Sequence, residues 1–377
     1  MEFKNLQLED VIVLEDKKRK PLSTMDRSKR KGIYPYYGAQ EIIDSIDDYI
    51  FDGKYILLAE DGENLKSRKK DLVKIVEGKF WLNNHAHIFK AKENVDLEYL
   101  YYYLLKLDLG EYITGSTQPK LNQENMNKIK IKLPELKIQR KISKILSNID
   151  GKIKLNNEIN NNLYELCRKI FEQTFNYDMS FESLDSLCSE ITRGYTKNYV
   201  EKSNLINLNQ KVNKGQNLEK LYYKYLDENQ DIPKNRYVRK NDILLNSLGQ
   251  GTLGRVHLFE ENVNNVVIDQ HISILRTGAR ISPYYLYYLL SSNEYQNKIE
   301  NSVTGTTGML MLNISVVRSF KIPVPNKKDI DYFDSIAKVC MDKITINTLE
   351  NEKLIELRDI LLPKLMNGEI DLDNIEI

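Results

Sequence analysis

Apolar residues alternate at steps of four and three along one long segment of the chain. Its members are Ile138, Ile142, Ile145, Ile149, Ile159, Leu163, Leu166 and Ile170. A mean spacing of 3.5 residues is typical of a coiled-coil seam. The segment contains no proline, so the pattern predicts one long helix over 135–177. Two amphipathic helices within one ordinary core are the alternative.

The same stripe returns 191 residues later, within 326–377. Its members are Phe333, Ile336, Cys340, Leu354, Leu357 and Leu361. Polar residues interrupt the two stripes at matching places, at Lys152 and Asn156 and at Lys343 and Asn347. An antiparallel helix pair would set Asn156 against Lys343 and Lys152 against Asn347, whereas a parallel pair would face two lysines. We therefore predict an antiparallel coiled coil whose register these four polar positions fix.

Short motifs before the two helices repeat in the same order. The pairs are 99–105 (YLYYYLL) with 285–290 (YLYYLL), 114–117 with 304–307, 121–122 with 312–313, and 131–134 with 322–325. The segments upstream of them contain strand-like patterns at 55–59, 88–89, 242–245, 255–259 and 272–275. The sequence therefore predicts an α+β fold with an internal pseudo-two-fold repeat. It has two mixed α/β domains with short twisted sheets, and a long helix follows each domain. The first domain is 1–134 and its helix 135–177; the second domain is 178–325, and its helix and the C-terminal tail are 326–377.

Composition narrows the class of protein without naming a partner. The formal net charge is +1 over 377 residues, so nucleic-acid binding would depend on local basic patches. Cys167, Cys188 and Cys340 lie far apart and fit a reducing compartment. The polar N-terminus and the lack of any run of about 18 apolar residues lead us to expect a cytoplasmic protein. The 24 tyrosines suit a binding surface, although AT-rich codon usage explains them as well.

The sequence contains few motifs of catalysis. Residues 249–254 (GQGTLG) match the dinucleotide fingerprint, with Asp269 downstream. A β-like segment follows instead of a helix, which favours a turn. The four histidines are too sparse for a zinc site, and His85 and His87 suit a surface or packing role. We expect no catalytic site, metal or cofactor in this chain.

Basic clusters are the stronger chemical signal. Residues 17–20 (KKRK), Arg27 and 29–31 (KRK) precede an aromatic loop at 32–38 (GIYPYYG), and 66–70 (KSRKK) form a second cluster. Cations contact phosphates, while Asn, Gln, Tyr and Arg read base edges. The pattern is typical of a DNA-binding surface, and a solvated charged face is the alternative.

Together these segments resemble the specificity subunits of Type I restriction–modification systems. The resemblance rests on 32–40 (GIYPYYGAQ), 49–62 (YIFDGKYILLAEDG), 82–87 (LNNHAH), 115–122 (GSTQPKLN), 133–134, 139–140 (QR) and 357–370 (LRDILLPKLMNGEI). It covers essentially the whole chain. The second helix entry, 325–330, lacks the Gln-Arg pair, and the second domain lacks the Tyr-Pro-Tyr-Tyr loop.

The resemblance implies a non-catalytic subunit in which each domain reads half of a bipartite target in double-stranded DNA. The helices would set the spacer and dock methyltransferase subunits, which bring S-adenosylmethionine and methylate adenine. Restriction subunits, where present, would bring ATP-driven translocation. A helical adaptor with incidental basic loops is the alternative. The candidate DNA-binding residues are Lys18, Arg19, Lys29, Arg30, Tyr34, Tyr36, Tyr37, Gln40, Lys66, Arg68, Lys69, Asn83, Asn84, Ser116, Thr117, Lys120, Arg193, Tyr195, Lys197, Asn246, Ser247, Gln250, Thr252, Arg255, Thr306 and Thr307.

Overall fold

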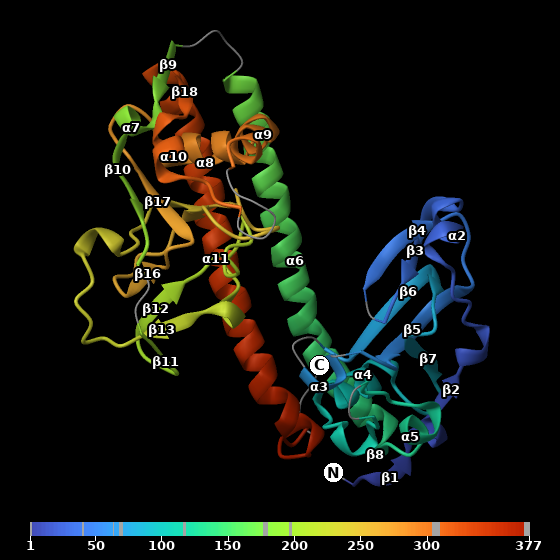
Figure 1. Cartoon of the computed structure of the whole chain (residues 1–377). Coiled ribbons are helices and arrows are strands. Elements are labelled where there is room, and N and C mark those ends of the chain that lie inside the picture. The colour runs from blue at the N-terminus through green and yellow to red at the C-terminus, as the bar shows by residue number, and fades with distance from the viewer. Residues whose placement is uncertain are drawn as a thin grey trace. The chain divides into compact units, whose positions relative to one another are not determined.

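The chain packs as two compact units (Figure 1). A computed structural model describes residues 2–39, 41–62, 64–67, 71–115, 118–175, 180–195, 198–303 and 310–372. Unit 1 is Met1–Lys154 with Asn351–Ile377, and unit 2 is Leu155–Glu350. Each unit contains one sheet-bearing domain and part of both long helices, α6 (Leu136–Thr174) and α11 (Lys327–Met366). No helix in the described part of the chain is long and apolar enough to cross a membrane.

Unit 1 is built on a six-stranded sheet. Its order is β2 (Ile12–Leu14), β7 (Ala86–Ala91), β5 (Phe51–Ala59), β6 (Val73–Leu82), β3 (Lys31–Tyr37) and β4 (Ile42–Ile46). A separate antiparallel pair joins β1 (Lys4–Gln7) to β8 (Lys130–Leu133). The short helices are α1 (Leu8–Val11), η1 (Asp16–Lys18), α2 (Thr24–Ser28), α3 (Asn64–Ser67), α4 (Leu97–Lys106), η2 (Gly110–Tyr112) and α5 (Gln123–Asn127).

Unit 2 contains two four-stranded sheets. One has the order β10 (Cys188–Arg193), β17 (Ile272–Thr277), β14 (Asp242–Asn246), β15 (Val256–Phe259), and the other β11 (Tyr199–Val200), β13 (Lys224–Leu226), β12 (Leu205–Leu208), β16 (Val266–Ile268). An antiparallel pair joins β9 (Ser180–Ser183) to β18 (Lys321–Val324). The helices are α7 (Leu184–Leu187), η3 (Lys220–Tyr222), η4 (Lys234–Arg236), α8 (Pro283–Ser291), α9 (Asn293–Asn301) and α10 (Ile314–Ser319).

The two units share one sheet topology. The order β2-β7-β5-β6 in unit 1 matches β10-β17-β14-β15 in unit 2, and every neighbouring pair is antiparallel. All five predicted strand segments lie in or overlap these strands. The repeat therefore extends into domains whose sequences share little besides the motifs near each helix, and the predicted fold class is confirmed.

The tyrosine-rich helices α4 and α8 pack inside their units. Tyr99, Tyr102, Tyr285 and Tyr288 are buried, which favours packing over a binding surface as the reason for these tyrosines. The Tyr99 hydroxyl donates to the Lys132 carbonyl at 2.9 Å, and the Tyr285 hydroxyl donates to the Pro323 carbonyl at 2.7 Å. Each helix is thereby fixed to the strand that leads into its long helix.

The entry to each long helix is tied to the cap of the preceding tyrosine-rich helix. In unit 1, the Gln139 side chain accepts from the backbone N–H of Asp96, the N-cap of α4, at 2.9 Å. It also donates to the Pro134 carbonyl at 2.8 Å. In unit 2, Ser282 caps α8 and its hydroxyl donates to Asp334 at 2.6 Å. A serine–aspartate contact thus replaces the glutamine that the second entry lacks.

The two long helices pair antiparallel within each unit. In unit 2 the Asn347 amide donates to the side-chain oxygen of Asn160 at 2.8 Å, and the Asn156 amide donates to Glu350 at 2.8 Å. In unit 1 Arg358 donates to Asp150 at 2.9 Å. Residue numbers fall along one helix as they rise along its neighbour, which confirms the predicted orientation.

The predicted register is wrong by about two helical turns. Asn156 contacts Glu350, so Lys343 lies about 10 Å further along the helix than the predicted pairing requires. Lys152 and Lys343 are exposed, whereas Asn156 and Asn347 are buried. Half of the seam positions lie one residue later than predicted. Leu146 takes the place of Ile145, and Cys167, which is buried, takes the place of Leu166, which is exposed. The observed packing keeps the ammonium groups of Lys152 and Lys343 in water, whereas the predicted packing would desolvate them.

The C-terminal segment closes the core of unit 1. Leu362, Leu365 and Leu372 are buried in the same apolar cluster as Ile142. The Lys141 ammonium donates to the Leu372 carbonyl at 2.7 Å.

Candidate nucleic-acid interface

Three segments of unit 1 meet at one end of its sheet. β5 ends at Ala59 and β7 begins at Ala86. The Glu60 N–H donates to the His85 carbonyl at 3.0 Å, and the Leu121 N–H donates to the Glu60 carbonyl at 2.8 Å. These bonds join residues 60–62, 83–85 and 118–121, which belong to three of the segments that carry the family resemblance. We call this meeting point the loop junction.

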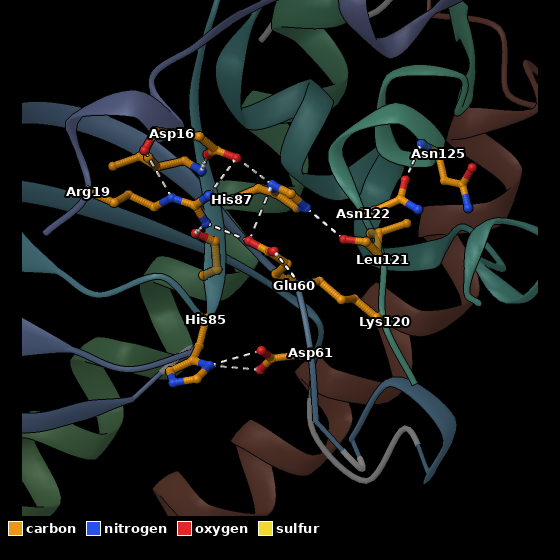
Figure 2. A network of polar contacts seen from close by, with 12 residues as sticks. Asp16, Arg19, Glu60, Asp61, His85, His87, Lys120, Leu121, Asn122 and Asn125 are labelled. Carbon is orange, nitrogen blue, oxygen red and sulfur yellow. Dashed lines mark hydrogen bonds and ion pairs between the residues drawn. The ribbon is translucent and has the colours of Figure 1, made fainter. Parts of the chain in front are cut away.

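A buried polar network lies behind the loop junction (Figure 2). His87 is 1% exposed, and its ring contacts Asp16 at 2.6 Å and the Leu121 carbonyl at 2.8 Å. Both ring nitrogens face acceptors. Arg19 pairs with Asp16 at 3.1 Å and with Glu60 at 2.7 Å. The Arg19 guanidinium thus bonds both carboxylates of the network inside the domain.

The same network is the candidate metal cluster of the described residues. Potential ligand atoms of Asp16, Glu60 and His87 lie within 4.8 Å of one another. The Arg19 guanidinium already contacts both carboxylates, and Lys120 contacts Glu60 at 3.2 Å. Side-chain cations therefore occupy the electrostatic role that a metal ion would have. We assign the cluster to holding the three segments in place.

Unit 2 forms an equivalent loop junction. The Ser247 N–H donates to the His271 carbonyl at 2.7 Å, and the Leu312 N–H donates to the Ser247 carbonyl at 2.9 Å. The strand registers pair Leu58 with His87 in unit 1 and Leu245 with Ser273 in unit 2. Ser247 and Ser273 therefore occupy the places of Glu60 and His87.

The side chains behind the second junction differ in chemistry from those of the first. The Ser247 and Ser273 hydroxyls are 2.7 Å apart, and the Arg193 guanidinium donates to the Leu312 carbonyl. Burial lowers the pKa of Arg193. A charged histidine–carboxylate network in unit 1 is thus replaced by a serine pair and one arginine.

The repeated Leu-Asn motif sets the third segment of each junction. Leu121 and Leu312 are fully buried. Asn122 caps α5 by accepting from the Asn125 N–H at 2.8 Å, and Asn313 caps α10 by accepting from the Ser315 N–H at 3.0 Å. An apolar anchor followed by an N-cap explains why these two residues recur together.

The predicted DNA-binding residues divide by exposure. Six are exposed, namely Lys18, Lys29, Lys66, Asn84, Lys120 and Gln250. Seven are half-buried, namely Arg19, Arg30, Tyr34, Arg193, Tyr195, Thr252 and Arg255. Five are buried, namely Tyr36, Tyr37, Asn83, Asn246 and Ser247. Gln40, Arg68, Lys69, Ser116, Thr117, Lys197, Thr306 and Thr307 lie outside the described residues.

The buried candidates require correction, because all five lie inside their domain and the polar atoms of four bond there. The Tyr36 hydroxyl accepts from the Leu22 N–H at 2.9 Å. The Asn246 amide donates to the carbonyls of Gln210 and Thr252, each at 3.0 Å. The Ser247 hydroxyl forms a hydrogen bond with the Ser273 hydroxyl. Tyr37 is buried as well, and this burial raises the pKa of its hydroxyl. In this conformation these side chains support the loops instead of facing DNA.

Three cations of the first basic cluster pair with acids on β4 and just beyond it. Arg27 and Lys31 pair with Asp44 at 3.3 and 2.6 Å. Arg30 pairs with Asp47 at 2.9 Å, and its guanidinium lies 4.9 Å from the Trp81 ring centroid. The cluster therefore offers fewer cations to phosphates than the sequence suggested.

The glycine-rich segment 249–254 is a turn between strands. Gly249, Gly251 and Gly254 all have positive φ, and β15 follows. The strand–turn–strand order expected from the sequence is confirmed, and it differs from the strand–turn–helix order of a dinucleotide site.

Two equivalent α+β domains, each joined to a long antiparallel helix and each displaying loops at one sheet end, define a two-domain recognition protein. The model of the Type I restriction modification DNA specificity domain matches residues 1–165 and 186–358. The chain belongs to this family, with two copies of the domain.

Individual relatives agree with this family. The putative type I restriction enzyme specificity subunit S.HindORF215P of Haemophilus influenzae is 34% identical over 139 residues, which span 37% of this chain and 35% of that relative. The HindI specificity subunit of the same organism is 21% identical over 84% of each chain. The crystal structure of a Type I S subunit from M. genitalium has the same fold, with a TM-score of 0.64, 16% identity, and coverage of 97% of this chain and 96% of that one.

Proposed function

We propose that this chain is the sequence-reading subunit of a Type I restriction–modification complex, and that each unit reads one half of a bipartite DNA target. The observation that carries the proposal is the loop junction, formed twice on the same strand order but around different polar side chains. A common scaffold with different loops suits two readers of different sequences. A simple helical adaptor would not require two such junctions.

Exposed polar residues near each junction are the candidate contacts. Asn84 and Lys120 lie at the first junction, and Gln250 lies in the glycine-rich turn that follows β14. Asparagine and glutamine read adenine edges, and lysine contacts phosphate. The near-neutral net charge then requires partner subunits to supply much of the phosphate contact.

Partners of the methyltransferase class would dock on the long helices. On α11, Tyr332, Val339 and Ile346 are exposed and recur every seven residues, on a face separate from the seam. An exposed apolar stripe on a helix suits a protein partner. Replacing Val339 and Ile346 by glutamate should abolish co-elution with the methyltransferase subunits. Replacing exposed Lys338 by glutamate is the matched control and should leave the complex intact.

The chain itself would carry no chemistry. S-adenosylmethionine and ATP would be bound by the methyltransferase and restriction subunits, acting together with this chain in the cytoplasm. The purified chain, given S-adenosylmethionine and DNA, should transfer no methyl group and cut no strand. Sustained turnover by a homogeneous preparation would contradict this part of the proposal.

The direct test of the function is the host methylome. Methylated adenines should be mapped in cells with and without this gene. Loss of one bipartite motif on deletion, and its return on complementation, is the expected result. An unchanged set of methylated sites in cells that express the partner subunits would overturn the proposal.

A further inference from the structure

The residues just before β7 and β17 form the same turn in both units. In unit 1 the turn is Asn83-Asn84-His85, and the Asn83 side-chain oxygen accepts from the His85 N–H at 2.9 Å. In unit 2 it is Asp269-Gln270-His271, and an Asp269 carboxylate oxygen accepts from the His271 N–H at 2.8 Å. In each turn the first residue is buried and the second is exposed.

A carboxylate holds each histidine ring in the same way. His85 Nδ1 lies 2.9 Å from Asp61, and His271 Nδ1 lies 2.7 Å from Asp269. In unit 1 the acid is Asp61, which lies just after β5, and in unit 2 it is Asp269 of the turn itself. Both carboxylates contact Nδ1. The side chains of His85 and His271 are 50% and 31% exposed. Within the described part of the chain, Nε2 of neither ring has a hydrogen-bond partner, so this atom can bond an outside group.

Both histidines lie at the loop junctions. The His85 carbonyl accepts from Glu60, and Asp61 forms a β-bridge with Lys120 of the third segment (Figure 2). The His271 carbonyl accepts from Ser247, and the next residue, Leu248, forms a β-bridge with Met311. The rings therefore lie where the proposed reading loops converge.

A purely structural role does not account for the repetition. The polar residues behind the two junctions differ between the units. Unit 1 has a histidine–carboxylate network, whereas unit 2 has two serines and an arginine. The Asp61–His85 contact is exposed and contributes little to stability, whereas Asp269 is buried and already accepts from the His271 N–H. Both units contain a half-exposed histidine whose ring contacts an aspartate. This shared feature points to an external partner that both units bind.

We propose that His85 and His271 are equivalent phosphate contacts, one in each half-site. This inference rests on the proposed function. The two units would read different bases, so a side chain placed identically in both fits what the half-sites share, the sugar–phosphate backbone. The residue beside each histidine differs, Asn84 in one unit and Gln270 in the other, and that position suits base reading.

The test is a phosphate-neutralisation scan on the assembled methyltransferase complex. Single methylphosphonates, which lack the phosphate charge, are placed along both strands of the cognate site, and Kd is measured for each duplex. With the unaltered complex, sensitive phosphates are expected in both halves. His85→Asn should weaken binding about five- to tenfold and remove the sensitivity at one phosphate of the first half only. His271→Asn should do the same at one phosphate of the second half only.

Controls separate the possible failures. The half-site that a variant leaves unaltered shows whether that variant is folded. The control variants are Lys128→Gln and Lys298→Gln, at exposed lysines that each pair with a glutamate four residues earlier. Both controls should keep the sensitivities of both halves. Histidine variants that keep both sensitivities, or that lose affinity only on cognate DNA, would overturn the phosphate assignment alone. An unaltered complex without preference for any bipartite site would instead overturn the proposed function.

Discussion

At the scale of single residues, neighbours in one basic run have different roles. Arg19 is mostly buried and bonds Asp16, Glu60 and the Ala86 carbonyl, whereas Lys18 is exposed and pairs only with Glu15 among the described residues. Both belong to a run of four cations that the sequence presents as uniform. The short η1 turn points successive side chains in different directions, and burial depends on strands far away in sequence. Sequence could therefore locate the cluster but could not separate its members.

Replacing Arg19 by methionine should destabilise the protein. The change leaves two largely buried carboxylates short of a partner, which costs about 3 kcal/mol in the free energy of unfolding. Urea denaturation measures the loss. Lys18→Met is the matched control and should leave the denaturation midpoint unchanged, while weakening binding to cognate and random DNA alike. Equal destabilisation by both changes would contradict the assigned roles.

The three thiols should react slowly in the folded protein, because Cys167 and Cys340 are buried and Cys188 is half-buried. Burial raises the pKa of Cys188 to about 12, and burial with the adjacent Cys340 raises that of Cys167. A raised pKa lowers the thiolate fraction at any given pH, and thiolate is the reactive form. Ellman's reagent at pH 8 should label the native chain slowly and three thiols promptly after unfolding. Rapid labelling of Cys167 in the native state would show that the helix seam opens there.

His85 and His271 are the candidate contacts that sequence reasoning missed. Asn-Asn-His and Asp-Gln-His each precede a strand, but the shared pattern is too short to stand out without the strand registers. Once the registers align the two units, the similarity of the turns is plain.

At the scale of elements, hydrophobic spacing predicted both long helices, and the polar residues that interrupt the two stripes predicted their antiparallel orientation. Hydrophobic spacing did not fix the register, because sliding one helix by a heptad, about 10 Å, presents the same seam positions to the partner. It also misplaced half of the seam by one residue, because a one-residue change of phase leaves the other half unchanged. Ile142, Ile149 and Leu163 suit either phase, so only burial of Leu146 and Cys167 decides between them. The strands were predicted from their apolar runs, whereas their order depends on contacts distant in sequence.

Disulfide trapping checks the register. In a background with Cys167, Cys188 and Cys340 replaced, Asn160→Cys with Asn347→Cys should cross-link, because these side chains touch in the structure. Asn156→Cys with Lys343→Cys should remain reduced. Efficient trapping of the second pair would restore the register first expected and contradict the structure.

At the scale of the whole molecule, the helices connect two readers. If they set the spacer, inserting seven residues into both α6 and α11 near the unit boundary should keep the heptad phase. It should lengthen each helix by about 10 Å, close to three base steps. The methylated motif should keep both halves and gain about three spacer bases. An active variant with an unchanged spacer would show that something else fixes the gap.

The central claim is that each unit reads its own half-site. The measurement that tests it most directly is an exchange of residues 180–324 for the corresponding domain of another family member, followed by mapping of methylated adenines in the host. The helices stay native, so the partners should still dock. The account predicts that one half of the methylated motif changes while the other half is retained. A change in both halves, or an unchanged motif in an active complex, would contradict it.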